Sequence, residues 1–483
     1  MLSNLFCGLN FFAIFLLTFF LGSKKIIKNL FVALLLTLFF VSELLSVLYY
    51  GHSIEEDVLF CITNLKIFYI ALNIKILMVY ACIYLLIVIF AIFYLILQKV
   101  HIQKFKNYFI TFSIVIFLLP GGFIYNIFYI FAVNYGYDYL KYKNATYQEL
   151  YRKEKDVDYV VRDEIKILNG NQKHKNLVLI YLESYEENLL TNSLVKEYTK
   201  DISKIAKDGE FYTNLPQLSA AMGTFNGMFT TLCGARLFNY ALFKNPYGEI
   251  IDDLKFTCMS DVLHKANYEQ VFIGGADKFL FNKGNLMLSH SYDVVEDKFS
   301  LVNQYPELKD KLNEWGVADF DVFEIAKERY KKLSESGKNF NLTILTTATH
   351  NINGIKDERC KNSSKDNNLL NAVECTDILV SDFVDFLKKQ PNYKDTIVVI
   401  LPDHIQYELN GLRDIIKDEE KTLFTIILNT GIKKEYNNPD IDYTNIPIII
   451  LDKLNVKSNA TFLDNFKDET VIKNFIHKTH FGN

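Results

Sequence analysis

The sequence predicts two regions of different class, an α-helical membrane bundle followed by an α/β domain with a mostly parallel central sheet. Half of the 483 residues are apolar, yet the mean hydropathy is only +0.08, so strongly apolar stretches must be averaged with ordinary soluble ones. Charged residues between Met1 and Val133 are confined to short clusters between long runs of Leu, Ile, Phe and Val. Further along, short β-branched runs alternate with amphipathic helical patterns. We therefore expect a membrane domain at 1–133, an interfacial linker at 134–175 and the α/β domain at 176–483.

The first region contains four stretches that are long enough to cross a hydrocarbon core, which needs about 20 apolar residues. They are Leu5–Leu21, Leu30–Tyr50, Ile76–Leu97 and Tyr108–Val133. Polar residues interrupt a further apolar stretch, Val58–Ile74, which we interpret as interfacial or re-entrant, with a fifth span as the alternative. The first stretch lacks a small-residue cleavage site before Ser23, so we interpret it as an anchor rather than a signal peptide.

The orientation of the spans follows from their loops. Lysines cluster at 24–28, and lysines and a histidine cluster at 99–106, while the intervening loop is acidic at 55–57. Basic loops stay in the cytoplasm, so four spans deliver everything after Val133 to the other side. We therefore expect a multi-pass protein of the inner (plasma) membrane with an extracytoplasmic, or periplasmic, soluble domain.

The charge of the chain argues against a nucleic-acid partner. The formal net charge is -4, and aromatic residues are not interleaved with a basic stripe. Proteins that bind nucleic acids usually present a basic surface to the phosphates, so no nucleic-acid partner is expected.

The soluble region contains an even number of cysteines, which suits disulfides in an oxidising compartment. They are Cys233, Cys258, Cys360 and Cys375. Our interpretation pairs neighbours, Cys233 with Cys258 and Cys360 with Cys375. Four buried free thiols are the alternative, because sequence alone does not fix connectivity.

Buried strands followed by polar residues indicate where a site would form. The expected strands are Asn176–Leu182, Gln270–Ile273, Asn341–Thr346, Thr396–Leu401 and Leu423–Asn429, with a helix at Leu369–Lys389. In α/β sheets ligands collect at the carboxyl ends of the strands. Glu183 follows the first strand, and Asp403 and His404 follow the fourth. Their mixed oxygen and nitrogen ligands suit Zn or Mn. Each residue alone is more often a turn or cap residue, but the three together favour a site.

Two further segments carry hydroxyl and imidazole groups. Small residues at 219–223 precede Thr224, which we expect to open a helix, where the local positive field favours an anionic phosphate. An ordinary helix cap is the alternative. His350 follows the third strand and is placed to protonate a leaving alkoxide, although a lone histidine is also common as a partly buried polar residue.

These motifs together resemble one superfamily. Glu183 in I-Y-L-E-S, Thr224 in G-T-x-x-G, Thr349-His350, P-D-H at 402–404, and Trp315-Gly316 before Asp319 resemble the alkaline phosphatase/sulfatase superfamily. Within it the sequence looks most like the membrane phosphoglycerol transferases and lipoteichoic acid synthases, over roughly residues 176–455. The resemblance implies a sulfatase-like (alkaline phosphatase-like) fold for the α/β domain.

The resemblance also implies roles for individual residues. The expected metal ligands are Glu183, Thr224, Asp403 and His404, with Thr224 as the nucleophile and His350 against the transferred group. The expected substrate contacts are Phe281, Asn282, Lys283, Trp315 and His350. Some family members have arginine at the position of Lys283. The lysine ammonium offers a single compact charge, whereas an arginine guanidinium can donate two parallel hydrogen bonds to a phosphate.

The implied function is metal-dependent transfer of a phosphoglycerol head group from phosphatidylglycerol, through a phosphothreonine, to a hydroxyl of a cell-envelope glycan. The partners would be a membrane lipid donor and a glycan or lipid-sugar acceptor. The nearest alternative is a phosphoethanolamine transferase acting on lipid A or another surface glycan. That family usually has cysteines close to the threonine, whereas Ala220 and Ala221 precede Thr224 here. A non-catalytic membrane sensor that has kept the fold is a second alternative, and a simple phosphatase or sulfatase is a third, although the C-x-P-x-R sequence of sulfatases is absent.

Overall fold

The computed structural model describes residues 162–218, 223–235, 257–350, 354–360, 367–406, 415–416 and 420–462. The chain divides into two compact units, and every described residue lies in the unit formed by Asn144–Gln406 and Asn410–Asn483. The predicted membrane spans lie outside the described residues. Of the helices in the described ranges, none combines the length and apolar character that a membrane span requires.

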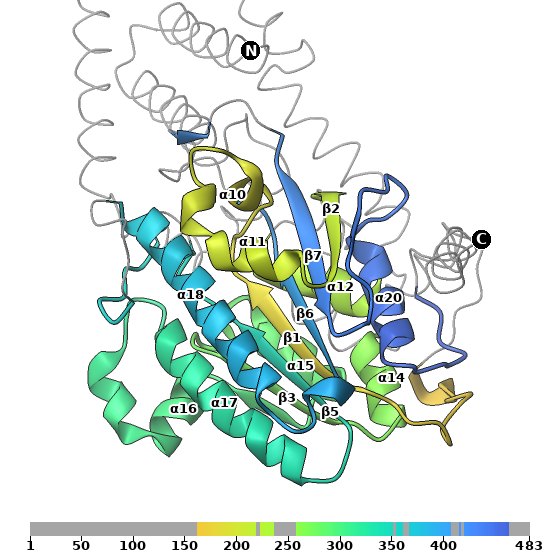
Figure 1. Ribbon diagram of the computed structural model, residues 1–483. Helices are drawn as coiled ribbons and strands as arrows, with labels where there is room; N and C mark the ends of the chain where they lie inside the picture. The colour runs from red at the N-terminus through yellow and green to blue at the C-terminus, as the bar shows by residue number, and fades with distance from the viewer. Residues whose placement is uncertain are drawn as a thin grey trace, which may run out of the picture. The chain divides into compact units, whose positions relative to one another are not determined.

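The centre of the described unit is a sheet of eight strands in the order β4-β3-β5-β1-β6-β7-β2-β8 (Figure 1). The strands are β1 (Asn176–Leu182), β2 (Glu210–Pro216), β3 (Glu269–Gly274), β4 (Val294–Glu296), β5 (Phe340–Leu345), β6 (Thr396–Pro402), β7 (Thr422–Leu428) and β8 (Lys434–Tyr436). All strand pairs from β4 to β6 are parallel, β7 is antiparallel to both of its neighbours, and β2 is parallel to β8. The predicted α/β domain with a mostly parallel sheet is confirmed.

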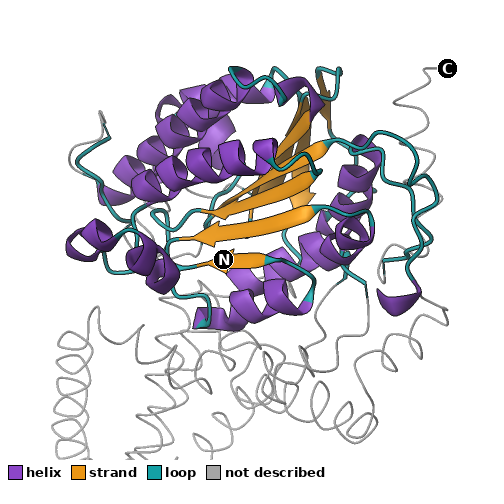
Figure 2. Cartoon of the chain, turned by 90° about the horizontal axis from the view of Figure 1, so that it is seen from below, coloured by secondary structure: helices purple, strands orange, loops and turns teal. Residues whose placement is uncertain are grey.

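Helices cover both faces of the sheet (Figure 2). One face carries α10 (Asn188–Thr191), α11 (Lys200–Ala206), α17 (Asp319–Glu335) and α18 (Asn368–Lys388), with α16 (Lys298–Gln304) beside them. The other face carries α12 (Thr224–Cys233), α14 (Met259–Lys265), α15 (Lys283–Ser289) and α20 (Ile446–Lys453). The described residues also form short 3-10 turns: η3 (Arg162–Glu164), η4 (Lys196–Tyr198), η7 (Leu280–Asn282), η8 (Pro306–Lys311), η9 (Tyr393–Asp395) and η10 (Tyr443–Asn445).

The two central strands explain why the site forms where it does. Every residue of β1 and β6 is buried, as expected for parallel strands that are covered on both faces. Their register pairs Leu182 with Pro402, so the two strands end side by side. The polar residues that follow them, Glu183 and Asp403, therefore leave the sheet next to each other.

Candidate active site

Three predicted metal ligands meet at the carboxyl edge of the sheet. One ligand atom from each of Glu183, Asp403 and His404 lies within 4.8 Å of the others. The three residues are 2%, 0% and 1% exposed, so their charges are almost fully withdrawn from water. Carboxylates at such depth are costly unless a cation or hydrogen bonds compensate them.

Ser184 joins the two carboxylates. Its backbone N–H donates to Asp403 Oδ1 at 2.8 Å, and its hydroxyl donates to Glu183 Oε1 at 2.7 Å. The residue has a φ of 49°, in the left-handed region that few non-glycine residues adopt. The tight turn after β1 therefore aims both the backbone and the side chain of Ser184 into the ligand group. Sequence reasoning missed this positioning role, although a serine directly after the strand-end acid was visible.

The orientation of His404 suits a metal ligand. Its Nδ1 lies 2.7 Å from the carbonyl oxygen of Ile405, which can only accept, so Nδ1 carries the proton. The other nitrogen, Nε2, lies 3.3 Å from Glu183 Oε1 and 3.7 Å from Asp403 Oδ2. In metal sites, a histidine usually donates one ring N–H to a carbonyl or carboxylate and binds the metal with the other nitrogen. His404 has this orientation.

The ligand group also contains an oxygen that accepts no hydrogen bond from the described residues. Asp403 Oδ2 is buried and has no hydrogen-bond partner among the described residues. A buried acceptor without a donor is a candidate position for a bound cation. Together with the oxygen and nitrogen donor set, it shows that these residues fit a divalent cation such as Zn or Mn.

The pKa values of the group reflect its crowding. Burial and the Glu183 carboxylate raise the pKa of Asp403 to about 8. Burial alone would lower the pKa of His404, but the carboxylates of Asp403 and Glu183 raise it to about 9. Burial works against ionisation of Glu183 as well, yet His350 and His404 hold the pKa of its carboxyl well below the usual range. Crowding therefore favours the protonated forms of Asp403 and His404.

Thr224 is the first residue of α12, as predicted, and it contacts the ligand group. Its hydroxyl donates to Glu183 Oε2 at 3.1 Å, and the residue is 9% exposed. The preceding Gly223 has a φ of 87°, which sets the sharp entry into the helix. The open first turn of α12 also provides backbone N–H groups beside the hydroxyl.

The helix lies unusually close to the end of β6. A Cβ atom added at Gly227 would come within 1.8 Å of the carbonyl oxygen of Asp403. Only a glycine permits this approach, because any side chain would meet backbone that cannot move aside cheaply. Gly227 therefore determines how closely Thr224 is held to the ligand group.

His350 lies at the edge of the same group. Its Nε2 is 4.0 Å from Glu183 Oε1, and its ring centroid is 4.0 Å from that of Trp315. The structure thus brings the predicted residues Trp315 and His350 together beside Glu183.

Asp319 secures the segment that carries His350. Its buried carboxylate accepts from the backbone N–H groups of Thr347 and Ala348 at 2.8 Å each, and from the Thr347 hydroxyl at 3.0 Å. Burial raises the pKa of Asp319 to about 6 despite these hydrogen bonds. Its role as an anchor was not predicted, because the sequence shows only an acid in the first turn of a helix.

Lys283, one of the expected substrate contacts, is buried at 4% exposed. Its ammonium donates to the carbonyl oxygens of Asp277 and Leu280 at 2.9 and 3.0 Å. Burial lowers its pKa to about 8, against the pull of nearby carboxylates that include Glu183. The backbone of Asn282 is left-handed, and the side chain of Phe281 lies outside the description.

Within the described residues, two disulfides join cysteines that are neighbours in the sequence. Cys233–Cys258 joins the end of α12 to the residue before α14, and Cys360–Cys375 joins the loop at 354–360 to α18. The first of these bonds ties α12, which carries Thr224, to the start of α14.

The chain matches one family profile and several curated proteins. The sulfatase family profile matches residues 175–468. A phosphoglycerol transferase I from Xanthomonas campestris is 29% identical over 296 residues, covering 59% of this chain and 42% of the relative. A phosphoglycerol transferase I from Escherichia coli is 27% identical over 261 residues, covering 52% and 34%. The chain thus spans less than half of the length of these curated relatives.

The chain is also similar to several solved structures. A protein in the alkaline phosphatase superfamily from Vibrio parahaemolyticus aligns with a TM-score of 0.49 and 20% identity, covering 61% of this chain and 69% of that one. The lipoteichoic acid synthase LtaP from Listeria monocytogenes aligns with a TM-score of 0.49 and 16% identity, covering 66% and 81%.

Proposed function

This chain belongs to the sulfatase family of the alkaline phosphatase superfamily, and we propose that it transfers a phosphoglycerol head group from phosphatidylglycerol to a hydroxyl of a cell-envelope glycan. The observation that carries the proposal is the hydrogen bond from the Thr224 hydroxyl to Glu183, inside the buried Glu183–Asp403–His404 group. The curated relatives that bear the name phosphoglycerol transferase I support the choice of head group.

The chemistry divides into two displacements at one phosphorus atom. In the first, the Thr224 hydroxyl releases its proton to solvent and Oγ1 forms a bond to phosphorus while the bond to the diacylglycerol oxygen breaks, leaving a phosphothreonine that carries glycerol. In the second, the acceptor hydroxyl attacks phosphorus, and Thr224 leaves and takes up a proton from solvent. When bound at Glu183, Asp403, His404 and Thr224, a divalent Zn or Mn ion supplies stabilisation of the alkoxide and of negative charge on the phosphoryl oxygens.

The surrounding residues handle protons and position. His350 gives a proton to the departing diacylglycerol oxygen and takes one from the acceptor hydroxyl, because it is the imidazole nearest to Glu183 at the edge of the site. Trp315 holds the His350 ring, and Asp319 holds the backbone before it. Phe281, Asn282 and Lys283 line the phosphate.

The cellular arrangement is part of the same proposal. Spans within residues 1–133 anchor the chain in the inner (plasma) membrane, and the linker at 134–175 leads to the catalytic domain at 176–483. That domain works on the extracytoplasmic face, where the lipid donor and the glycan acceptor are both within reach.

The choice of donor can be measured directly. The purified full chain, in vesicles of labelled phosphatidylglycerol or labelled phosphatidylethanolamine, is expected to release the head group faster from phosphatidylglycerol. Faster release from phosphatidylethanolamine would instead favour a phosphoethanolamine transferase. Release from neither lipid, with the metal present, would contradict both forms of the proposal.

The close approach of α12 to β6 gives a second expected result. Replacing Gly227 by alanine should lower stability by about 1–3 kcal/mol, as overpacking in a close-packed interior does. Head-group release should fall further than this loss of stability explains, because the displaced helix carries Thr224 away from Glu183. Thermal unfolding and initial rates measure the two effects.

Gly170→Ala is the matched control for this substitution. A Cβ at Gly170 would meet its nearest neighbouring atom at 3.9 Å, an ordinary contact, so both quantities should stay unchanged. Wild-type stability and rate in Gly227→Ala would show that α12 is not held at this distance.

A further inference from the structure

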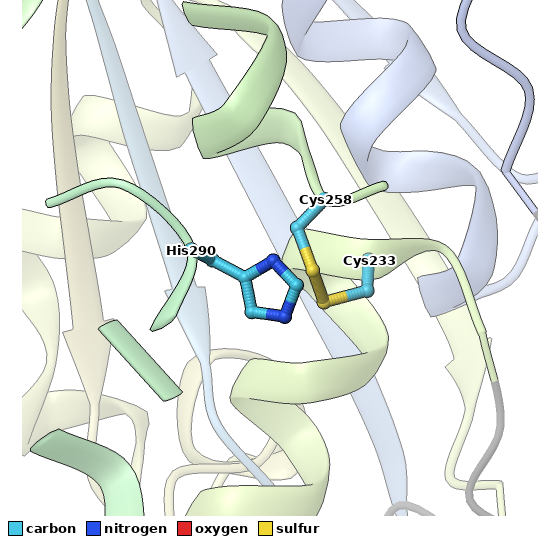
Figure 3. Close-up of side chains that lie close together, drawn as sticks. All are labelled: Cys233, Cys258 and His290. Atoms are coloured by element: carbon cyan, nitrogen blue, oxygen red, sulfur yellow. A yellow bond between two sulfur atoms is a disulfide. The ribbon is translucent and has the colours of Figure 1, made fainter. Parts of the chain in front are cut away.

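A second cluster of metal-ligating side chains lies at the opposite end of the nucleophile helix. Cys233 is the last residue of α12, Cys258 directly precedes α14, and His290 directly follows α15. One ligand atom from each of the three lies within 4.8 Å of the others, and the three residues are at most 1% exposed. Figure 3 shows the imidazole of His290 beside the disulfide that joins the two cysteines.

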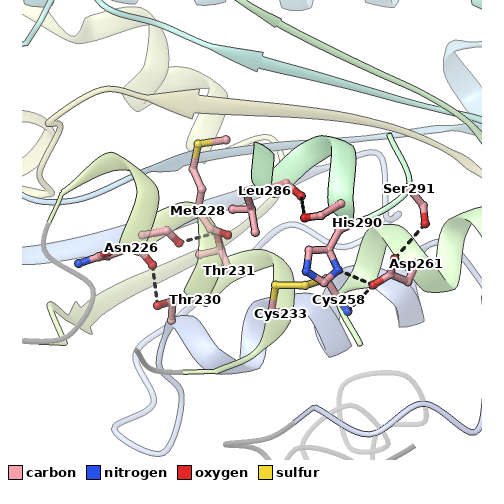
Figure 4. Close-up of a disulfide and its surroundings, with 12 residues drawn as sticks. Asn226, Met228, Thr230, Thr231, Cys233, Cys258, Asp261, Leu286, His290 and Ser291 are labelled. Carbon is pink, nitrogen blue, oxygen red and sulfur yellow. Dashed lines mark hydrogen bonds and ion pairs between the residues drawn. A yellow bond between two sulfur atoms is a disulfide. The ribbon is translucent and has the colours of Figure 1, made fainter. Parts of the chain in front are cut away.

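The imidazole is oriented by a buried carboxylate. His290 Nδ1 lies 2.7 Å from Asp261 Oδ2, and Asp261 also accepts from the backbone N–H of Cys258 and the hydroxyl of Ser291, at 2.9 Å each (Figure 4). A histidine that binds a metal through one nitrogen usually holds a carboxylate or carbonyl with the other. A metal bound here would take Nε2, because Nδ1 is committed to Asp261.

We propose that Cys233, Cys258 and His290 form a Zn²⁺ site whenever their disulfide is reduced. A phosphine or dithiol reductant supplies two electrons, the S–S bond breaks, and each sulfur takes up one proton. On metal binding the two thiols release these protons to solvent, and two thiolates and one imidazole nitrogen bind the ion. Two sulfurs and a nitrogen favour Zn²⁺ over Mn²⁺ or Mg²⁺, and the fourth position is left to water.

The site differs from the candidate active site in its chemistry and does not depend on the proposed transferase activity. Glu183, Asp403 and His404 offer oxygen and nitrogen only, whereas this cluster offers sulfur. The disulfide and the metal exclude each other, and either one ties the end of α12 to α14. Newly made chains contain both thiols before the disulfide forms, so the reduced state is one through which every molecule passes.

Cobalt provides a direct probe of the site. The full chain, purified in detergent, is reduced with a phosphine, freed of reductant without oxygen and titrated with Co²⁺. We expect a thiolate-to-cobalt charge-transfer band and the intense visible bands of tetrahedral Co²⁺, both removed by Zn²⁺. The unreduced chain should lack the thiolate band, because its oxygen and nitrogen ligands cannot give one.

Matched variants locate the signal. Cys360→Ser/Cys375→Ser removes the other disulfide and should keep the thiolate band, whereas Cys233→Ser/Cys258→Ser should lose it. His290→Gln should weaken Zn²⁺ binding by at least about tenfold, the lower end of what metal-site residues contribute. Absence of the band from the reduced wild type, or its persistence in Cys233→Ser/Cys258→Ser, would overturn the proposal without affecting the transferase assignment.

Discussion

Thr224→Ala is expected to abolish head-group transfer, with a rate at least about a thousandfold below wild type, since removing a nucleophile eliminates the covalent route. The hydroxyl contacts Glu183 but contributes little to the apolar core, so the variant should fold normally. Thr224→Ser keeps the hydroxyl and should retain part of the activity. Initial rates of head-group release and thermal unfolding of the three proteins measure these outcomes.

Thr230→Ala is the control on the same helix. Its hydroxyl donates only to the carbonyl oxygen of Asn226 within α12, so the variant tests loss of a buried threonine away from the ligand group. Wild-type transfer by Thr224→Ala would remove the proposed mechanism. Equal losses in Thr224→Ala and Thr230→Ala would assign the effect to the helix rather than to the nucleophile.

Exhaustive chelation is expected to stop transfer while the domain stays folded. Without a cation, proton uptake relieves repulsion between Glu183 and Asp403, because the pKa of Asp403 is raised to about 8. The core of the described unit is large and does not include Glu183, Thr224, Asp403 or His404, unlike that of a small zinc module whose metal ligands hold the fold together. Mn or Zn should restore activity and Ca should do so weakly, because a tight site with a nitrogen ligand disfavours Ca.

Metal analysis, circular dichroism and transfer rates on the same samples separate the outcomes. The disulfide-bonded chain is used throughout, so that the cysteine cluster cannot take up the added ion. Full transfer by a chain shown to hold no metal would mean that Glu183, Asp403 and His404 have another role. Unfolding on chelation would make the metal structural.

The sequence predicted the central strands well because each is a buried apolar run between polar turns. The predicted strand at 176–182 coincides with β1, and the other four expected strands lie within two residues of β3, β5, β6 and β7. Three strands were not predicted. β4 and β8 have only three residues, and β2 is only partly buried, so none carries a strong apolar signal. The reversed direction of β7 was also hidden, because its apolar pattern is the same in either direction.

The site residues that could be predicted from the sequence are mainly those that directly follow buried strands. Glu183, Asp403 and His404 come together because β1 and β6 are neighbours in register, and Thr224 joins them at the start of α12. The positioning residues were harder to identify. Ser184 is positioned by its left-handed backbone, and Asp319 accepts hydrogen bonds from backbone N–H groups that are distant in the sequence. No pattern of side chains in the sequence indicates either feature.

The phosphothreonine is the central claim, and trapping it is the most direct test. The full chain is mixed with phosphatidylglycerol labelled in its head group, without acceptor, quenched in acid and digested for mass spectrometry. We expect a phosphoglycerol adduct on the peptide that contains Thr224, absent from Thr224→Ala and lost when a glycan acceptor is added before the quench. Head-group release at a normal rate with no adduct on Thr224 would contradict the account, because transfer would then proceed without a covalent intermediate on that residue.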